Sequence, residues 1–416
     1  MTGRLAVRLT DEAVEAIRRA EFPAAKDTVH LKASGGSPMC RSAFDAQERY
    51  LRQMCFEGDL YYSDYLTEMD RGRARIAAYL GAAPEEIAFT VNSSSAASIV
   101  AAQLMRAGIR RAYYPISEFP TSVYALAHTE IELVPVGDPG VRDSGGDWLQ
   151  AVSAHLAANP TSKRCALVAS HVCYLNGATL DIAEAATLCR RHDLLFVLNA
   201  TQSFGALSID VGAGVDMLFA TGLKWAFAGY GAGFLYLKQS LIDAIGLPSG
   251  TGWLSVEDPY RMDNRNTAPV LRGRSLDAGG GMPHFGPLLG LGGALEMYER
   301  IGNGDIRAGI TAVEARLLQN ASHLRARLLD AGAELLGPSD SAARSGIVSM
   351  VSKNARDIAA RLAAEKILVS LRTLPGESEP SVLRFGVHFF NTQKELESAL
   401  SVLGLAEKSS YFFASP

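Results

Sequence analysis

Cysteine is scarce in this sequence, and none of its cysteines forms a Cys-x-x-Cys pair. The chain has 416 residues and five cysteines, which are Cys40, Cys55, Cys165, Cys173 and Cys189. An odd number without paired spacing argues against a disulfide framework and against a zinc site built from cysteine. We therefore expect buried thiols in a reducing compartment, and no metal ion.

The sequence also lacks an excess of positive charge. It has 40 lysines and arginines against 44 aspartates and glutamates, a formal net charge of -4. Proteins that bind nucleic acid need basic groups to neutralise phosphates, so we expect no nucleic-acid partner. Arg71, Arg73 and Arg75 cluster in a helical stretch, and we expect them to form a solvated helix face.

Long apolar runs and a secretory leader are missing as well. Residues 1–23 have the pattern of an amphipathic helix with acids early and arginines late, rather than an apolar stretch followed by a cleavage site. The longest charge-free runs, residues 87–105 and 278–295, are interrupted by polar residues or glycines. We expect a protein with no membrane span, located in the cytoplasm.

Short apolar strands alternate with helical segments from about Glu86 to Leu237. The candidate strands are residues 87–91, 111–116, 131–136, 165–172, 194–200, 217–221 and 233–237. This alternation predicts an α/β domain whose mainly parallel sheet is covered by helices on both faces. Ligands of such sheets bind where strands end and helices begin.

The pattern changes after Gly286. Long helical stretches are followed by candidate strands at residues 346–352, 367–372 and 382–387, with helices between them. This order is typical of a smaller α+β domain. We place the large domain at residues 26–286 and assign residues 1–25 and 287–416 to the small domain.

Lys224 lies between the apolar strand at 217–221 and a glycine-rich turn at 228–233. A partly buried lysine tends to become a neutral amine, which can form a Schiff base with a carbonyl. Taken alone, a lysine that extends to the surface fits equally well. The glycine spacing differs from a dinucleotide fingerprint, so a nucleotide-binding oxidoreductase is a minor alternative.

Polar residues follow two other candidate strands. Asn199 and Gln202 come at the end of a buried strand, where polar side chains need partners such as a bound ring. Ser93 and Ser94 lie where a strand turns into a helix. Backbone N–H groups and hydroxyls at such a turn suit an anion such as phosphate, although helix capping explains the serines equally well.

Six motifs occur in a fixed order along the chain. They are NSSS (92–95), EFP (118–120), SHVCYLNGATLDI (170–182), LNATQSFGAL (198–207), TGLKW (221–225) and VLRFGVHFFNTQKELESAL (382–400). This ordered set resembles the class V aminotransferase and cysteine desulfurase-like superfamily of pyridoxal 5'-phosphate (PLP) enzymes. It is most similar to the isopenicillin N epimerase-like and ergothioneine C-S lyase-like branch. The resemblance implies the PLP-dependent transferase fold type I, with a seven-stranded sheet, and a homodimer with composite sites.

The resemblance also implies how the cofactor is held. Lys224 would form the Schiff base with PLP and later move the substrate proton. Ser93, Ser94 and Thr221 would hold the phosphate. Phe119 falls where the family places a ring that stacks on the cofactor, a task that an aromatic face suits.

Further residues take their expected roles from the same resemblance. Gln202 would hydrogen-bond the ring hydroxyl of PLP, with Tyr174 or Asn176 nearby. Arg384 matches the arginine that binds the substrate carboxylate, as a planar bidentate donor can. Arg372 is a weaker candidate for the same task, and a surface ion pair is the alternative for it.

Three positions depart from the family pattern. Asn199 replaces an aspartate that keeps the ring nitrogen protonated, and asparagine cannot supply that negative charge. Leu223 replaces a histidine, and Gly280 replaces a threonine that reaches the phosphate of the partner subunit. We therefore expect a looser hold on PLP and a weaker electron sink.

These departures bear on the reaction that we expect. A PLP enzyme acting at the α-amino carbon of an amino acid, or of an amino-acid conjugate such as a cysteine conjugate, fits the motifs. We favour β-elimination of a C-S bond, then transamination or deamination, then epimerisation. A catalytically impaired PLP-binding protein with a structural or regulatory role is the alternative. Residues 373–383 contain no cysteine, which disfavours sulfur transfer through an enzyme persulfide.

Overall fold

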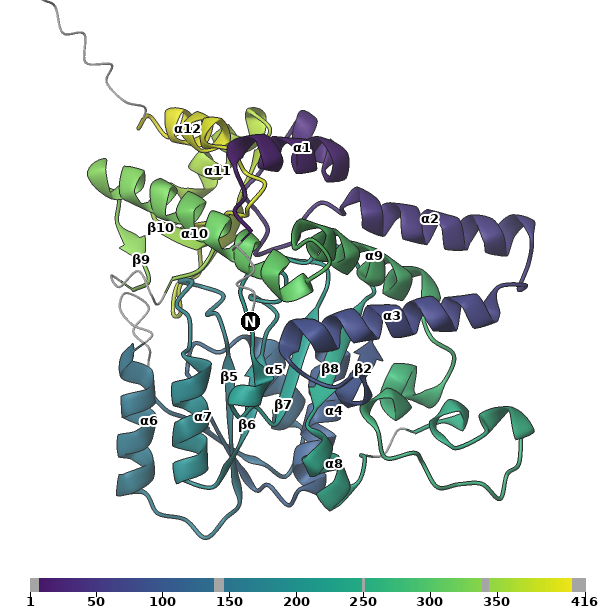
Figure 1. Ribbon diagram of the computed structural model, residues 1–416. Coiled ribbons are helices and arrows are strands. Elements are labelled where there is room, and N and C mark those ends of the chain that lie inside the picture. The colour runs from purple at the N-terminus through teal and green to yellow at the C-terminus, as the bar shows by residue number, and fades with distance from the viewer. Residues whose placement is uncertain (1–6, 138–145, 249–250, 339–343, 406–416) are drawn as a thin grey trace, which may run out of the picture.

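A seven-stranded sheet forms the centre of the protein (Figure 1). The structure is a computed structural model that describes residues 7–137, 146–248, 251–338 and 344–405. The strands are β2 (Ile87–Thr90), β3 (Arg111–Tyr114), β4 (Glu132–Pro135), β5 (Cys165–Ser170), β6 (Leu194–Asn199), β7 (Met217–Thr221) and β8 (Gly233–Leu237). Their order is β2-β8-β7-β6-β5-β3-β4. Every strand expected between residues 87 and 237 is present, and the predicted α/β fold is confirmed.

Only β8 runs against its neighbours in this sheet. It is antiparallel to both β2 and β7, because a turn rather than a helix connects it to β7. The strands β3, β4, β5, β6 and β7 pair in parallel. Since β2 and β7 both oppose β8, the carboxyl ends of the other six strands all lie at one edge of the sheet.

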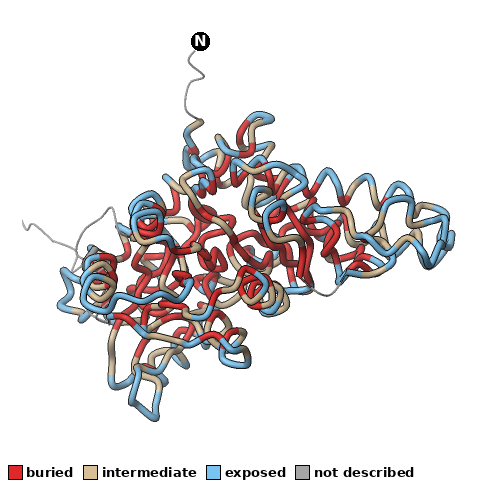
Figure 2. The backbone as a smooth tube through the Cα atoms, turned by 90° about the horizontal axis from the view of Figure 1, so that it is seen from below, coloured by how far each residue is buried: buried red, intermediate tan, exposed pale blue. Residues whose placement is uncertain are grey.

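Helices cover both faces of the sheet. They include α4 (Ser93–Arg106), α5 (Pro120–Ala127), α6 (Gly146–Ala158), α7 (Ile182–Arg191) and α8 (Gln239–Ile245). Alternate strand residues point to opposite faces. Phe89 accordingly joins a core with α6 and α7, whereas Ala88 joins a second core with α4, α5 and α8. Figure 2 shows buried backbone in the interior of the molecule and exposed backbone mainly at its periphery.

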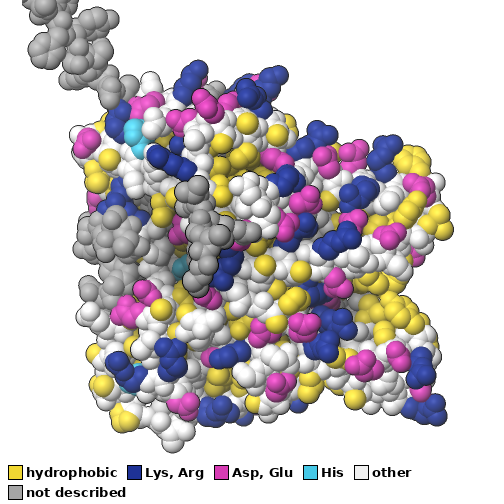
Figure 3. Space-filling view, viewed as in Figure 1, with side chains coloured by type: hydrophobic (Ala, Val, Ile, Leu, Met, Phe, Trp, Pro, Cys, Tyr) yellow, Lys and Arg dark blue, Asp and Glu magenta, His cyan; other side chains and the backbone are white. Residues whose placement is uncertain are grey.

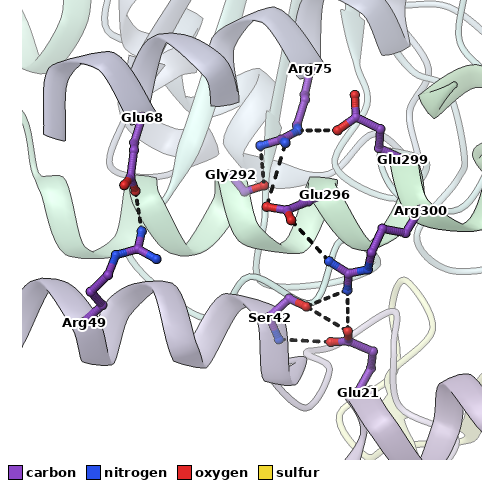
Figure 4. Close-up of polar contacts among 9 residues, drawn as sticks. All are labelled: Glu21, Ser42, Arg49, Glu68, Arg75, Gly292, Glu296, Glu299 and Arg300. Carbon is purple, nitrogen blue, oxygen red and sulfur yellow. Dashed lines mark hydrogen bonds and ion pairs between the residues drawn. The ribbon is translucent and has the colours of Figure 1, made fainter. Parts of the chain in front are cut away.

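Three helices pack together at one side of the sheet, namely α2 (Arg41–Phe56), α3 (Tyr62–Leu80) and α9 (Phe285–Ile301). Small residues bring them close, since a Cβ atom on Gly293 would lie 2.5 Å from the Ser42 carbonyl oxygen. Ion pairs then join the helices, as in Arg75 with Glu299 at 2.9 Å (Figure 4). These contacts fix α9, which leads the chain toward its C-terminal part.

The expected solvated face at Arg71, Arg73 and Arg75 is wrong for Arg73. That side chain is buried, its guanidinium lies 4.6 Å from the centre of the Phe89 ring, and its Nη2 is 2.5 Å from Oδ2 of Asp277. Residues two apart in a helix point to nearly opposite sides. Arg71 is therefore exposed while Arg73 faces inward.

The C-terminal part has its own four-stranded antiparallel sheet in the order β12-β13-β10-β9. Its elements are α10 (Ile306–Asp330), β9 (Leu335–Leu336), β10 (Ile347–Val351), α11 (Ala355–Ala364), β12 (Ser370–Arg372), β13 (Val382–Gly386) and α12 (Gln393–Val402). The strand expected at 367–372 is divided at Val369, because β11 (Ile367–Leu368) pairs instead with β1 (Val29–His30).

The N-terminal helix returns to this part of the molecule. Helix α1 (Asp11–Glu21) lies near α12, and Arg18 and Glu395 form an ion pair at 2.5 Å (Figure 1). The division of the chain into a large domain at residues 26–286 and a small domain formed by the remaining residues stays a prediction.

Short 3-10 helices occur at Pro23–Lys26, Pro84–Glu86, Val211–Ala213, Trp253–Ser255, Pro259–Arg261 and Gly273–Gly280. No helix in the described part of the chain is long and apolar enough to cross a membrane.

Candidate active site

The carboxyl ends of the parallel strands bring the candidate residues to one edge of the large sheet. Ser93 follows β2, Asn199 ends β6, and Lys224 follows β7. Ser170 and Asn199 are register partners at the ends of β5 and β6. This edge is where sheets of this kind bind ligands.

The residue next to Lys224 is held from several sides. Trp225 is fully buried, and its indole Nε1 donates to Oε1 of Gln202 at 2.8 Å. The Trp225 carbonyl oxygen accepts hydrogen bonds from the Tyr298 hydroxyl at 2.7 Å and from Nε2 of His388 at 3.0 Å. These bonds fix the backbone, so that the Lys224 side chain projects from a rigid turn.

Lys224 itself is half-buried, and its amine is perturbed. Burial, followed by the positive charges of Arg384 and Arg372, lowers the pKa of Lys224 to about 7. An ordinary lysine has a pKa near 10.4. A large fraction of Lys224 is therefore a neutral amine at physiological pH, the form that reacts with carbonyl groups.

An aromatic pair lies beside this amine. The centre of the Phe119 ring is 5.4 Å from Nζ of Lys224. Tyr174 meets Phe119 edge to face, with ring centres 5.3 Å apart and an angle of 78° between the planes. The face of Phe119 offers a flat surface next to the lysine, as a stacked planar ligand requires.

A buried polar network lies at the same sheet edge, and the sequence did not reveal it. Glu118 accepts hydrogen bonds from the Ser122 hydroxyl at 2.9 Å and from the Ser170 amide at 2.7 Å. The Ser122 oxygen accepts in turn from Nδ2 of Asn199 at 3.0 Å, while Oδ1 of Asn199 accepts from the Thr201 amide at 3.0 Å. Burial raises the pKa of Glu118.

This network accounts for the asparagine at position 199. Ser122 gives its single proton to Glu118, so toward residue 199 it can only accept. An amide N–H satisfies that requirement, whereas a carboxylate has no proton to give. The second N–H of the Asn199 amide remains available to a ligand.

The first turn of α4 is suited to an anion. Asn92 caps this helix by accepting from the Ser95 amide at 2.9 Å. The amides of Ser93 and Ser94 are the first two helical positions and have no acceptor within the helix. Ser94 also has its hydroxyl 3.3 Å from that of Thr121. Together these donors can bind a phosphate.

Thr221 and Gln202 already have partners. The Thr221 hydroxyl donates to the Ala232 carbonyl oxygen at 3.1 Å, so its proton is used within the turn. Gln202 donates from Nε2 to the Ser34 carbonyl oxygen at 3.0 Å and accepts from Trp225, which leaves one of its N–H groups for a ligand. Asn176 closes its own turn by accepting from the Ala178 amide at 3.0 Å.

The segment from Ser34 to Ser37 is a further part of the site that the sequence did not indicate. Ser37 donates its amide to the Leu223 carbonyl oxygen at 3.1 Å. A Cβ atom on Gly36 would lie 3.7 Å from the Leu223 side chain. The bond from Gln202 to Ser34, across 168 residues of sequence, ties this segment to the lysine turn.

Two arginines of the small sheet face the same site. Arg384 is fully buried, and its Nη1 donates to the Tyr174 carbonyl oxygen at 2.5 Å, whereas Nε and Nη2 have no partner among the described residues. Burial and the positive charge of Arg372 lower the pKa of Arg384 to about 9. Arg372 is half-buried and donates to the Leu371 carbonyl oxygen at 2.6 Å.

Gly280 occupies a position that would not admit threonine in this structure. Its φ is +73°, and a Cβ atom there would collide with the Gly252 backbone. The preceding turn is anchored by Asp277, which accepts hydrogen bonds from Arg73 and from the Phe89 amide. The close approach of two chain segments thus favours glycine at position 280.

The residues fit PLP in chemistry and placement. A lysine amine with a lowered pKa lies beside an aromatic ring, and the first turn of α4 offers amide and hydroxyl donors to an anion. The amide nitrogens of Asn199 and Gln202 each use one N–H within the protein and keep a second N–H. The described residues contain no cluster of three or more side chains that could hold a metal ion.

Known proteins resemble this chain over nearly its whole length. Residues 31–398 match the family described as Aminotransferase class-V. The uncharacterized aminotransferase YcbU of Bacillus subtilis is 25% identical, with 91% of this chain and 94% of that protein covered. Isopenicillin N epimerase of Amycolatopsis lactamdurans is 24% identical, with 90% of this chain and 94% of that protein covered.

Solved structures agree on the fold. A cystine C-S lyase in complex with its product cysteine persulfide superimposes with a TM-score of 0.78 at 19% identity, covering 93% of this chain and 99% of that one. The likeness supports fold type I, and the extent of the family match decides the relationship. This chain belongs to the class V aminotransferase family of PLP-dependent enzymes.

Proposed function

We propose that this protein carries PLP on Lys224 and acts at the α-carbon of an amino acid or amino-acid conjugate, with cysteine conjugates as the favoured substrates. The observation that carries the proposal is that Lys224 and Arg384 lie in the same site. Lys224 has an amine whose pKa of about 7 leaves much of it neutral near pH 7, and Arg384 has a fully buried guanidinium with two nitrogens that no described residue partners. When bound, PLP supplies a ring that withdraws electrons from the α-carbon.

The cofactor roles follow from donors that remain unused. The Ser93 and Ser94 amides would hold the phosphate at the start of α4, and Phe119 would cover one face of the ring. The spare N–H of Gln202 would donate to the ring hydroxyl. The spare N–H of Asn199 would donate to the ring nitrogen, so that the nitrogen stays unprotonated.

The catalytic roles fall to Lys224 and Arg384. Arg384 would hold the substrate carboxylate with two parallel hydrogen bonds. With the carboxylate fixed, the α-hydrogen of the substrate would lie within reach of Lys224, which removes it as a general base. Both groups approach from the side that Phe119 and Tyr174 border.

We favour β-elimination of a C-S bond as the outcome, ahead of transamination or deamination and then epimerisation. An amide at position 199 leaves the PLP ring a weaker acceptor of electrons from the α-carbon. β-Elimination depends less on the ring, because the departing sulfur takes the electron pair. A similar fold is used by a cystine C-S lyase. Burial raises the pKa of Cys173, the cysteine beside Tyr174, and so disfavours the thiolate that a persulfide carrier needs.

We also propose that the enzyme is a homodimer with composite sites. Large apolar side chains are exposed at the end of the α2–α3 hairpin and on residues 251–282, including Leu51, Phe56, Leu60, Tyr260, Met262 and Met282. Figure 3 shows hydrophobic surface gathered on that side of the molecule. A patch of this kind on a globular protein marks an interaction site.

A spectrum and a substrate panel test the proposal. Purified protein supplied with PLP should show a visible absorbance band that Lys224→Ala abolishes. Incubation with amino acids and cysteine conjugates should release pyruvate and ammonia from the latter. A colourless protein that takes up no PLP would contradict the proposed function, and amination of the cofactor without pyruvate would favour transamination instead.

A further inference from the structure

We infer that Arg372 binds a second anionic group of the substrate, so that the preferred substrate is an amino acid or conjugate carrying a distal carboxylate or similar anion beside its α-carboxylate. The inference rests on the proposed function, because it assumes that Arg384 holds the α-carboxylate. It narrows the substrate from amino acids in general to those with two anionic ends.

The strand register places both arginines on one face of the small sheet. Ser370 pairs with Arg384, and Arg372 pairs with Val382. Directly paired residues share a face, and so do residues two apart on a strand. Arg372 and Arg384 are therefore diagonal neighbours on the same face.

This face is turned toward the active site. On the opposite face of β12 and β13, Leu371, Leu383 and Phe385 belong to an apolar core. On the near face, Arg384 donates to the Tyr174 carbonyl oxygen. The positive charges of both arginines also act on the Lys224 amine. Both guanidinium groups thus lie around the space that a substrate on Lys224 would occupy.

The near face contains polar atoms that no described residue satisfies. Nε and Nη2 of Arg384 and the Ser370 hydroxyl are buried without a hydrogen-bond partner. Neither Arg372 nor Arg384 forms an ion pair with a carboxylate in the described ranges. A buried charge with unpartnered donors is costly, so the combination of buried Arg384 and half-buried Arg372, neither with a carboxylate partner in the described ranges, suits an anionic ligand.

The balance of charge indicates how many anions the ligand has. One α-carboxylate neutralises the guanidinium of Arg384 and leaves that of Arg372. Lys224 adds less than a full positive charge at pH 7, since its pKa is about 7. A substrate with two anionic groups matches two arginines, whereas one with a neutral side chain leaves Arg372 uncompensated.

The position of Arg372 indicates which end of the substrate it meets. It is less buried than Arg384, and it borders a groove that Lys32, Gly35 and Ser370 line together with α11, including Arg356. A Cβ atom on Gly35 would lie 2.9 Å from the Ser370 hydroxyl, so glycine keeps this approach open. The second anion would therefore be at the outer, side-chain end of the substrate.

Binding of unreactive acids to the PLP-bearing protein tests the inference without relying on turnover. Glutarate has two carboxylates and butyrate has one, and neither has an amine. We expect glutarate to bind about tenfold more tightly than butyrate, or better, when dissociation constants are measured by calorimetry at fixed ionic strength. Arg372→Met should bring the two constants close together, and Arg372→Lys should retain part of the preference.

Arg325→Met is the matched control. Arg325 is also half-buried and donates to a backbone carbonyl, that of Leu336, but it lies on α10 and is not among the charges that act on the Lys224 amine. The Arg325→Met variant should therefore keep the preference for glutarate over butyrate. Equal binding of both acids to the unaltered protein, or a preference that survives Arg372→Met, would overturn the inference. A protein that prefers glutarate but never carries PLP would support the anion site and overturn the proposed function.

Discussion

The two walls of the active site use their polar groups in opposite ways. The large-sheet wall consists of Glu118, Ser122, Asn199 and Gln202, and each of them has hydrogen-bond partners within the protein. The small-sheet wall consists of Ser370, Arg372 and Arg384. On that wall the Ser370 hydroxyl and two guanidinium nitrogens of Arg384 are buried and find no partner in the described part of the chain.

The difference indicates what each wall is for. Satisfied networks stabilise the fold and hold their members in one orientation, as a permanently bound cofactor requires. Unsatisfied buried groups cost about 1–3 kcal/mol each and are tolerated where a ligand supplies the missing partner. The large-sheet wall is thus organised before any ligand arrives, whereas the small-sheet wall is completed by one.

Lys224 lies between the two walls, and its removal should have the largest effect. Lys224→Ala should abolish the visible band of the PLP-bearing protein and lower kcat by about 10²–10⁴, because both cofactor attachment and proton removal are lost. Absorbance spectra and product release measure this. Lys163→Ala, at an exposed lysine paired with Glu132, is the control and should change neither. A Lys224→Ala protein that keeps the band would contradict the assignment.

The second-largest effect is expected for a change at Arg384, on the small-sheet wall. Arg384→Met should weaken substrate binding by about 10–150-fold, since hydrogen bonds to a charged group are worth about 1.5–3 kcal/mol. The free energy of unfolding of the protein without ligand should not fall, because an unpaired buried charge is removed. Ligand titration and urea denaturation measure the two quantities.

Ser122→Ala provides the matched change on the large-sheet wall. It should lower the free energy of unfolding by about 1–3 kcal/mol, because Glu118 and Asn199 each lose a partner. If Arg384→Met proved as destabilising as Ser122→Ala, the contrast between the walls would be wrong.

Sequence patterns predicted the parts of the site that follow strands directly. The apolar strands before Asn199 and Lys224 are short, regular and bounded by polar or glycine-rich segments, so their ends could be located. The structure then brings Lys224, Phe119, Tyr174 and Arg384 together. Their chemical roles stay predictions.

Contacts between distant segments could not be predicted in the same way. The bond between Ser34 and Gln202 spans 168 residues, and that between Asn199 and Ser122 spans 77. No local pattern encodes such pairs. The same reason explains the error at Arg73, whose partner Asp277 is 204 residues away.

A comparable effect on stability is expected when Asn199 is replaced by the aspartate that we expect of the family. Asn199→Asp should lower the free energy of unfolding by about 1–3 kcal/mol, because two carboxylates would then face the single proton of Ser122. In the PLP-bearing protein it should speed the half-reactions of transamination with simple amino acids.

The double variant Asn199→Asp/Glu118→Gln tests the cause of this destabilisation. Neutralising residue 118 removes the repulsion, so the double variant should be more stable than the sum of the two single changes predicts. Urea denaturation of the unaltered protein, both single variants and the double variant gives the coupling. If the changes in the free energy of unfolding were strictly additive, Glu118 would not be the reason for an asparagine at position 199.

The smallest effect is a shift in the pH at which the protein takes up PLP. Attachment needs the neutral amine, so its rate should be half-maximal near pH 7, where the pKa of Lys224 lies, and should fall about tenfold per unit at lower pH. Arg384→Met should raise the midpoint, and Arg372→Met should raise it less, because Arg384 is the stronger of the two positive charges that lower this pKa. Stopped-flow absorbance of protein freed of PLP measures the rate. A midpoint near the pKa of an ordinary lysine, or one that neither variant moves, would show that the charges of the small-sheet wall do not lower the pKa of Lys224.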